Sequence, residues 1–358
     1  MNEAYRQVTK SNDQERQELF ALTARRVGIT EQSVEKDFWV CWTLDTLFNG
    51  RRKGAPRLLF KGGTSLSKAF GLINRFSEDI DITVFREDLG EPVSIDDLEK
   101  MTGKKRKAKL DEIRETCQEY LKDELRPELE ALLLEAVDGN NDQKCGVALD
   151  DTDPDGQTLL LRYPTPLVAD SYVRSEVRIE CGAKSALDPH VNATLRPYVA
   201  EDLADADLTV AEVTTIQPTR TFWDKVVIVH GLRGWFETRG ELRQEGQRIS
   251  RHYYDLHVIL GTDTGGKALA DLPLGAECVR HARMFFNRPD FRLETATPGS
   301  FAVVPIDKMR DALRRDYDAM AGMIIGAPPR FEDVIASIAL LEERLNEGAT
   351  AGSGGSEH

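Results

Sequence analysis

The chain has 358 residues, of which 41% are hydrophobic and 30% are charged, so it is long enough to bury a sizeable core and to form two lobes. Its formal net charge of −14 excludes a protein that grips nucleic acid over its whole surface, and leaves only a local nucleic-acid site. The five cysteines lie far apart, which argues against structural zinc and disulfides, and neither a signal peptide nor a bilayer-crossing run is present. We therefore expect a cytoplasmic protein without a membrane partner.

The N-terminal part predicts two helices that alternate with two short strands. Helical spacing covers residues 29–48 and 64–73, and strand patterns cover 57–60 and 79–85. Thr30 is placed to cap the first helix, and Gly62-Gly63 forms a turn before the second because glycine has backbone freedom. In the second strand charged and apolar residues alternate, so we expect Ile80 and Ile82 to face the core.

The rest of the chain changes from mixed to mostly helical. Residues 98–137 predict one long helix, or two interrupted near Pro127, and two strands follow within 158–164 and 171–180. After Pro218 the apolar spacing is helical, in the segments 219–236, 249–260, 278–286, 306–325 and 331–346. We therefore expect an α+β protein with a mixed sheet and a mostly helical C-terminal lobe. The expected division is a sheet-containing domain over 1–210, a helical domain over 211–346 and a flexible tail over 347–358.

Two aspartates, Asp79 and Asp81, stand one residue apart on the second predicted strand. Residues i and i+2 of a strand point to one face about 7 Å apart, so these carboxylates project together and repel one another. A divalent cation removes that repulsion, and paired metal ions in phosphoryl chemistry lie about 3.5–4 Å apart, within reach of converging carboxylates. The pattern favours a site for Mg²⁺ or Mn²⁺. The alternative is an ordinary turn followed by a polar strand.

The turn at Gly62 and Gly63 offers a complementary place for phosphate. Glycines let backbone N–H groups approach phosphate oxygens, and the start of the following helix adds a favourable dipole. Thr64, Ser65 and Lys68 are the nearby side chains that could bond to phosphate or balance its charge. Together with the aspartates, this turn predicts a site that handles nucleotide phosphates.

Charged residues in the helical half each allow two interpretations. Arg220 and Lys225 lie on one largely apolar helix, where a lysine can also simply extend its ammonium to water. Arg251 and Asp255 are spaced to form an ion pair, and His252 is either a proton carrier or a hydrogen-bonded structural histidine. From these residues alone both interpretations stay open.

Basic residues cluster at Arg51–Lys53 and at Lys104–Lys109. Such clusters are either solvated surface or contacts for RNA, and salt-sensitive binding would support RNA.

The order of a Gly-Gly turn, a helix and Asp-x-Asp on a strand resembles the DNA polymerase β-like nucleotidyltransferases. The stretch KGGTSLSKAFGLINRFSEDIDI, residues 61–82, is similar more specifically to the AbiEii/AbiGii family of nucleotidyltransferase toxins in abortive-infection and type IV toxin–antitoxin systems. Other segments that carry the resemblance are EKDFWVCWTLDTLF, VRIECGAKS, TRTFWDKVVIVH, SRHYYDLHVIL, DYDAM and PPRFEDVIASIALLEERLN. These segments keep a consistent order over nearly the whole chain.

The resemblance implies a role for each matching residue of the sheet-containing half. Gly62–Ser65 matches the phosphate-binding turn, and Asp79 and Asp81 match the metal-binding pair. The superfamily often has a third carboxylate on a neighbouring strand, for which Glu180 is the candidate. Glu176 lies on the same strand face as Glu180 and is the alternative.

In the helical half, Lys225 matches the family's motif lysine, which is expected to meet the triphosphate of a nucleotide, and Arg220 adds a second positive group one turn earlier. Asp255 matches the aspartate of the fourth motif. The catalytic residues that the resemblance implies are Asp79, Asp81, Lys225 and Asp255. One departure from the family pattern is an acidic insertion around residues 138–155.

The implied activity is metal-dependent transfer of a nucleotidyl group from an NTP to an acceptor, in phage defence or growth arrest. The leading acceptor is RNA, above all the 3′ end of tRNA, and the implied partner is an antitoxin encoded nearby. A protein hydroxyl is the alternative acceptor. A catalytically silent module that binds a nucleotide or a partner is an alternative of another class.

Overall fold

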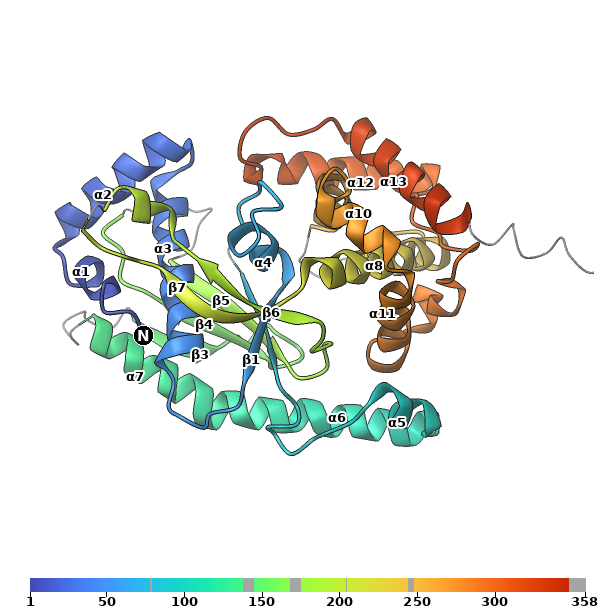
Figure 1. The fold of residues 1–358 in the computed structure, drawn as a ribbon, viewed down its shortest axis with the longest axis horizontal. Coiled ribbons are helices and arrows are strands. Elements are labelled where there is room, and N and C mark those ends of the chain that lie inside the picture. The colour runs from blue at the N-terminus through green and yellow to red at the C-terminus, as the bar shows by residue number, and fades with distance from the viewer. Residues whose placement is uncertain (78, 138–144, 168–174, 204, 244–247, 348–358) are drawn as a thin grey trace, which may run out of the picture. The chain divides into compact units, whose positions relative to one another are not determined.

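The structure is a computed structural model that describes residues 1–77, 79–137, 145–167, 175–203, 205–243 and 248–347 (Figure 1). The chain forms two compact units, Met1–Gly71 with Phe76–Ile216 and Leu72–Arg75 with Gln217–His358. The first unit contains the sheet, and the second is helical. The short segment Leu72–Arg75 thus belongs to the second unit although both its neighbours in sequence belong to the first.

A seven-stranded mixed sheet organises the first unit, in the order β3-β4-β5-β2-β1-β7-β6. Its strands are β1 (Leu58–Lys61), β2 (Ile80–Val84), β3 (Gly146–Leu149), β4 (Thr158–Arg162), β5 (Glu176–Gly182), β6 (His190–Leu195) and β7 (Val210–Ile216). The pairs β1–β7 and β2–β5 are parallel, and the other neighbouring pairs are antiparallel. The expected α+β class with a mixed sheet is confirmed.

The sequence identified the central strands better than the outer ones. The strands expected at 57–60, 79–85 and 158–164 are β1, β2 and β4. The strand expected at 171–180 is β5, although residues 171–174 lie outside the described part of the chain. Three further strands, β3, β6 and β7, fall where no strand was expected.

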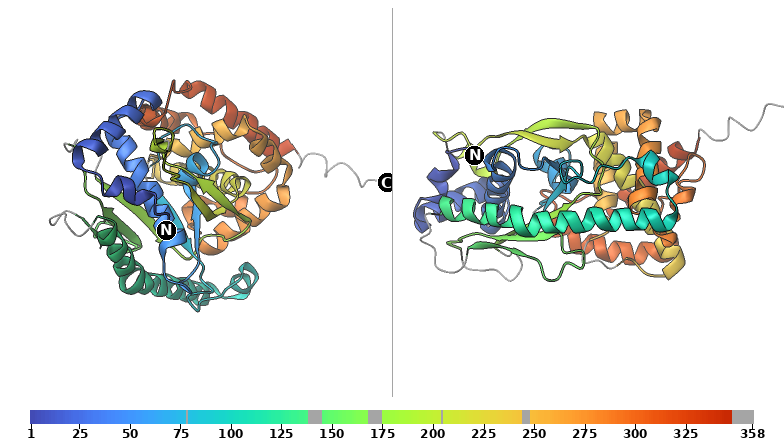
Figure 2. Two further views of the ribbon diagram at one scale, coloured as in Figure 1. Left: turned by 60° about the vertical axis from the view of Figure 1, so that its left-hand side comes forward. Right: turned by 90° about the horizontal axis from the view of Figure 1, so that it is seen from below.

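Seven helices of the described residues belong to the first unit. They are α1 (Tyr5–Thr9), α2 (Asp13–Val27), α3 (Glu31–Asp45), α4 (Gly62–Lys68), α5 (Ile95–Lys100), α6 (Gly103–Tyr120) and α7 (Arg126–Ala136). The N-cap predicted for α3 is confirmed, because Thr30 Oγ1 accepts a hydrogen bond from Ser33 N at 3.1 Å. A π-helical turn, Leu121–Leu125, joins α6 to α7 into one long rod (Figure 2). Pro127 lies in the first turn of α7, directly after this π-helical turn, so the helix changes its hydrogen-bond pattern near the expected position while the rod continues.

The helix expected over 64–73 is wrong at both ends. Helix α4 already begins at Gly62 and stops at Lys68. Gly71 follows with a φ of +60°, and the next four residues, Leu72–Arg75, pack with the second unit. Helical spacing through Ile73 was therefore misleading, because these apolar residues serve a different core.

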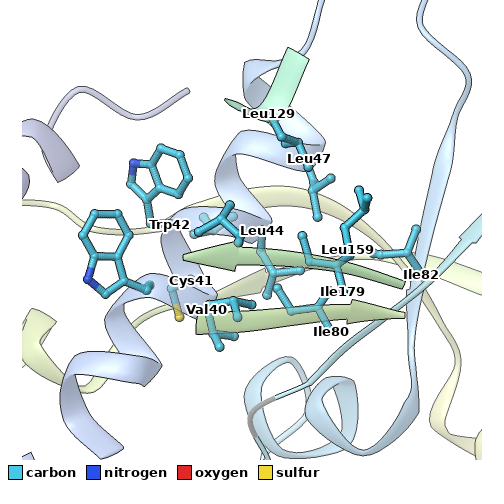
Figure 3. Packing of buried hydrophobic residues seen from close by; sticks show 14 of the residues in the cluster. Val40, Cys41, Trp42, Leu44, Leu47, Ile80, Ile82, Leu129, Leu159 and Ile179 are labelled. Atoms are coloured by element: carbon cyan, nitrogen blue, oxygen red, sulfur yellow. The ribbon is translucent and has the colours of Figure 1, made fainter. Parts of the chain in front are cut away.

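The core of the first unit lies on one face of the sheet, against α3. Ile80 and Ile82 of β2 are buried there, as expected, together with Ile179 of β5. Figure 3 shows these residues beside Leu44 of α3 and Leu47 of the π-helical turn Thr46–Gly50 that follows α3. Burial of each such side chain stabilises the fold by roughly 1.5–3 kcal/mol. Because side chains alternate along a strand, Asp81 points to the opposite face.

The second unit consists mainly of helices. They are α8 (Pro218–Arg239), α9 (Ser250–Leu260), α10 (Asp263–Ala270), α11 (Leu272–Phe285), α12 (Asp307–Met320) and α13 (Phe331–Glu347). All but α10 lie at the segments that the sequence predicted to be helical, and the tail after residue 347 lies outside the described residues. Within the described part of the chain, no helix combines the length and the apolar character that crossing a membrane requires.

Candidate active site

Three neighbouring strands bring Lys61, Asp81 and Glu180 side by side. In the register of the sheet, Lys61 of β1 lies opposite Asp81 of β2, and Asp81 lies beside Glu180 of β5. Paired positions point to the same face, so the three side chains share the face opposite to the α3 core. The Lys61 ammonium lies 3.7 Å from Asp81 Oδ1, with 30% and 27% of the two side chains exposed. Two carboxylates and a cation therefore meet at one accessible place on the sheet.

Gly62 follows directly on Lys61 and lies against the Asp81 carboxylate. Its φ of +78° is in the left-handed region that favours glycine, and a Cβ atom at this position would overlap the carboxylate of Asp81. The turn expected from Gly62 and Gly63 is in fact the start of α4. Glycine is needed at position 62 for its backbone conformation and for this close approach.

The hydroxyl groups of Thr64 and Ser65 bond within the protein. Thr64 Oγ1 donates to the carbonyl of Asp79 and lies 2.8 Å from Ser77 Oγ, while Ser65 Oγ donates to the carbonyl of Gly62 at 2.9 Å. Both residues are fully buried. Thr64 thus fixes the backbone where the chain enters β2. Because both hydroxyl groups already bond within the protein, the donors that α4 could offer to a phosphate are its backbone N–H groups.

Lys68, the last residue of α4, forms a buried ion pair with Asp37 of α3, and its ammonium lies 3.7 Å from the centroid of the Tyr198 ring. The two paired side chains are 7% and 4% exposed. Burial acts to lower the pKa of Lys68, but Asp37 outweighs it and raises the pKa above its usual value. The pair ties α4 to α3, and a contact between Lys68 and phosphate stays a prediction.

Of the two glutamates considered for a third carboxylate, Glu180 lies nearer to Asp81. Glu180 is in register with Asp81, whereas Glu176 stands at the first position of β5, before the residues that pair with β2. Glu176 instead lies opposite Arg162 of β4, with 3.5 Å between Oε2 and Nε. The geometry therefore favours Glu180 over Glu176 as a neighbour of the aspartate pair.

Arg178, two residues before Glu180 on the same strand face, neutralises part of this acidic group. Its Nε lies 3.1 Å from Glu180 Oε1, and its Nη1 contacts Asp150. Burial acts to lower the pKa of Arg178, but Glu180, Asp150 and Asp79 outweigh it and raise the pKa above its usual value. Arg178 therefore stays charged beside the carboxylates.

The chemistry of Asp79 and Asp81 suits a hard divalent cation, since carboxylate oxygens are the ligands that Mg²⁺ and Mn²⁺ prefer. Within the described residues, no group of three or more His, Cys, Asp or Glu side chains is arranged to hold a metal ion. Magnesium commonly needs only one or two protein carboxylates, because waters and substrate phosphates supply the other oxygens. The carboxylates of the aspartate pair suit such a substrate-completed site chemically, and the metal roles of Asp79, Asp81 and Glu180 stay predictions.

In the second unit, Asp255 of α9 is completely buried between two cations. Arg75 donates to it in bidentate fashion, Nε to Oδ1 at 2.8 Å and Nη2 to Oδ2 at 2.9 Å, and Lys225 Nζ of α8 lies 2.8 Å from Oδ2. Burial acts to raise the pKa of Asp255, but the two cations outweigh it and hold the pKa well below its usual range. Burial lowers the pKa of Lys225, which Asp255 partly offsets. Asp255 is thus ionised and fully engaged.

Two other candidates of the helical half are also enclosed. Arg220 is fully buried and contacts Asp224 at 3.3 Å and Glu277 at 2.9 Å, so its contact with a nucleotide stays a prediction. Burial, reinforced by the charges of Lys225 and Arg251, lowers the pKa of His252 well below its usual value. His252 Nδ1 is buried without a hydrogen-bond partner among the described residues. This histidine is therefore neutral at physiological pH.

Sequence reasoning missed three cations of these sites, Lys61, Arg75 and Arg178. The period of two along β5 was enough to place Arg178 on the face of Glu180, and Lys61 adjoins the glycine turn. Nothing local distinguishes Arg75, because its partner Asp255 lies 180 residues away in the sequence.

Comparison with known proteins places this chain in a family. The model of the nucleotidyl transferase AbiEii toxin family of type IV toxin–antitoxin systems matches residues 45–337. Among solved structures, the chain is similar to MenT4, a nucleotidyltransferase toxin from Mycobacterium tuberculosis H37Rv, with 14% sequence identity and a TM-score of 0.32 over 84% of this chain and 98% of that one. No curated protein matches. The chain belongs to the AbiEii family of nucleotidyltransferase toxins.

Proposed function

We propose that this toxin transfers a nucleoside monophosphate from an NTP to a hydroxyl group of RNA in the presence of Mg²⁺ or Mn²⁺, with the 3′ end of tRNA as the leading acceptor. The hydroxyl oxygen would attack the α-phosphorus of the NTP, and the bond from this phosphorus to the oxygen of the β-phosphate would break, so that pyrophosphate leaves. The observation that carries the proposal is the register of Lys61, Asp81 and Glu180 on three adjacent strands, directly beside the close approach of Gly62 to the Asp81 carboxylate. Family membership supports the same reaction class and an antitoxin as a partner.

Each residue of the site would contribute position or charge. Asp79 and Asp81 would hold the divalent cation, which would stabilise negative charge on the transferred phosphoryl group and lower the pKa of the acceptor hydroxyl. Gly62 lets the backbone at the start of α4 approach the Asp81 carboxylate closely, and Thr64 fixes the carbonyl of Asp79. Lys225 would balance the charge of the triphosphate. Because phosphoryl transfer depends mainly on positioning and electrostatics, no nucleophilic side chain is required.

Exposed cations on α6 favour RNA over a protein as the acceptor. Lys104, Lys105 and Lys107 are exposed on the first turns of this helix, and the first turn itself contains no acidic residue. By contrast, Arg52 of the other basic cluster contacts Glu124. In a chain with a net charge of −14, such a local basic surface is where a polyanion would bind.

The test is transfer of label from each common NTP, labelled at the α-phosphate, to total RNA and to total protein with Mg²⁺. We expect label in small RNA, lost on RNase treatment, in the presence of a chelator and in Asp81→Ala. Label in protein would support nucleotidyl transfer but show that the acceptor is a protein and not RNA. No label in either fraction, with folded protein and a supply of every NTP, would favour the catalytically silent module.

A further inference from the structure

The chain leaves the first unit between α4 and β2 and returns to it just before the aspartate pair. Leu72–Arg75 is the excursion, and it packs with the helices of the second unit. Backbone contacts hold it there: Arg75 forms an antiparallel bridge with Ile324, and Ile325 N donates to the carbonyl of Asn74 at 2.9 Å. The segment is therefore anchored by its backbone as well as by its side chains.

The side chain of Arg75 gives this anchor a fixed orientation. Its guanidinium and the Asp255 carboxylate meet through two parallel hydrogen bonds of 2.8 and 2.9 Å, a geometry that a planar fork imposes and a single-point ammonium does not. The two side chains are 4% and 0% exposed. Breaking one partner of a buried pair leaves an uncompensated charge, so the contact resists opening.

Both carboxylate oxygens of Asp255 are already bound by cations of the protein, so neither is open to a substrate. Oδ1 accepts from Arg75, and Oδ2 accepts from Arg75 and contacts Lys225. A carboxylate that is fully buried and bound by two cations is arranged to hold its neighbours in place. The resemblance implied a catalytic role for Asp255, and this geometry indicates how the reaction could depend on it without contact.

Only three residues separate Arg75 from Asp79 in the sequence. At the far end of this short stretch, the Thr64 hydroxyl donates to the carbonyl of Asp79 and lies 2.8 Å from Ser77 Oγ. The stretch that leads into the aspartate pair is thus held at residue 75 by Asp255 and at residues 77 and 79 by Thr64. Loss of either anchor would give Asp79 more freedom.

We infer that Arg75 and Asp255 form a positioning clamp, which fixes the chain entering the Asp79–Asp81 pair, so that nucleotidyl transfer depends on Asp255 although Asp255 does not touch the substrate. This inference rests on the proposed function of the aspartate pair. It assigns Arg75, which no sequence pattern singled out, as a positioning residue of the reaction.

The test combines two readouts on Arg75→Lys, Asp255→Asn and the control Arg239→Lys. Arg239 pairs with Asp290 elsewhere in the second unit, where its Nε and Nη2 both donate to Oδ2 at 2.9 and 2.6 Å, so its variant changes an arginine–aspartate contact at the surface. Hydrogen–deuterium exchange of peptides that span residues 72–84 needs no substrate and reports on the clamp alone. We expect exchange there to rise about tenfold in the two clamp variants and to stay unchanged in the control.

Steady-state kinetics then separates positioning from substrate contact. A clamp predicts that kcat falls about 30-fold in both variants. The KM for the NTP should change little in Arg75→Lys, which keeps the pair of Asp255 and Lys225, because geometry and not binding is lost. Unchanged exchange in the clamp variants would overturn the inference, and so would a rise in KM at constant kcat. If the wild type transfers no nucleotide at all, the proposed function fails, and the exchange data alone still decide whether the clamp exists.

Discussion

A Cβ atom on residue 62 would lie 1.9 Å from Oδ2 of Asp81 and 2.6 Å from its Cγ. Carbon and oxygen atoms that are not bonded stay roughly 3.5 Å apart, so either the carboxylate or the start of α4 would have to move. The position of the Asp81 carboxylate therefore depends on the absence of a side chain at Gly62.

Gly62→Ala should abolish most of the activity and leave the protein folded. Displacing a metal-binding carboxylate by about 1 Å can cost about 100-fold in turnover. Gly54→Ala is the matched control, because Gly54 has nearly the same φ, +80°, but open space around its Cβ position. Both variants should lose about 1 kcal/mol of unfolding free energy from the left-handed backbone, measured by urea denaturation. Equal losses of turnover in the two variants would show that the clash with Asp81 is unimportant.

Lys61→Met should bind Mn²⁺ more tightly than the wild type. The Lys61 ammonium lies 3.7 Å from Asp81 Oδ1 and would compete with a cation for this oxygen. An ion pair of this exposure is worth up to about 1 kcal/mol, so its removal should tighten binding about fivefold in a calorimetric titration with MnCl₂. Lys53→Met, at an exposed loop lysine, should leave the affinity as it is. Equal affinities of Lys61→Met and wild type would exclude competition at Asp81.

Lys68→Met should destabilise the first unit strongly, because it leaves Asp37 buried without its ammonium. Breaking a buried ion pair costs about 3 kcal/mol. The double variant Lys68→Met/Asp37→Asn should be more stable than the single one, since the amide oxygen can still accept from Tyr198 N, which now donates to Asp37 at 2.7 Å. Urea denaturation of the two variants measures this difference. A double variant less stable than the single one would mean that Asp37 has another essential role.

Glu35 should make stability depend on pH in the acid-to-neutral range. Its side chain is 2% exposed, and burial raises its pKa to about 7, although Thr165 donates to it. Between about pH 4.5 and 7 the folded protein keeps this proton while the unfolded chain has lost it, so stability falls as the pH rises through that window, by about 3 kcal/mol in all.

Glu35→Gln should remove this dependence of the unfolding free energy on pH, because the amide stays neutral at every pH. Urea denaturation at about pH 5 and about pH 8 gives the slope directly. The exposed residue Glu18 of α2 provides the control, and Glu18→Gln should keep the wild-type slope. A wild-type slope in Glu35→Gln would assign the pH dependence to other groups.

Local patterns predicted the strands that alternate regularly and missed those that do not. The alternation of Asp and Ile in β2 is regular, and it placed Ile80 and Asp81 on opposite faces. In β7 the pattern is broken at Glu212, whose φ of +54° departs from extended backbone, and the register with β6 shifts between Ala193 and Leu195. Such an irregularity moves side chains between faces, so a period of two no longer identifies the strand.

The candidate site was predictable where its residues are close in sequence or where the family resemblance supplied them. The glycine turn and the aspartate pair could be read from one stretch, and Glu180 was recognised as a carboxylate on a neighbouring strand. The partners of Thr64, Lys68 and Asp255 could not be predicted, because each is brought in by packing: a carbonyl, Asp37 and Arg75. Sequence motifs identify which groups carry charge, while tertiary contacts decide which of these charges are already neutralised.

The excursion of Leu72–Arg75 into the second unit has a consequence for inheritance. A recombination event between Ile216 and Gln217 would appear to exchange two separate modules, yet it would take Asp255 from one parent and Arg75 from the other. The hybrid would bury a guanidinium without its partner wherever the second parent lacks an aspartate at position 255, at the cost of an unpaired buried charge. An exchange that keeps the Arg75–Asp255 pair must therefore carry the excursion together with the helices that anchor it.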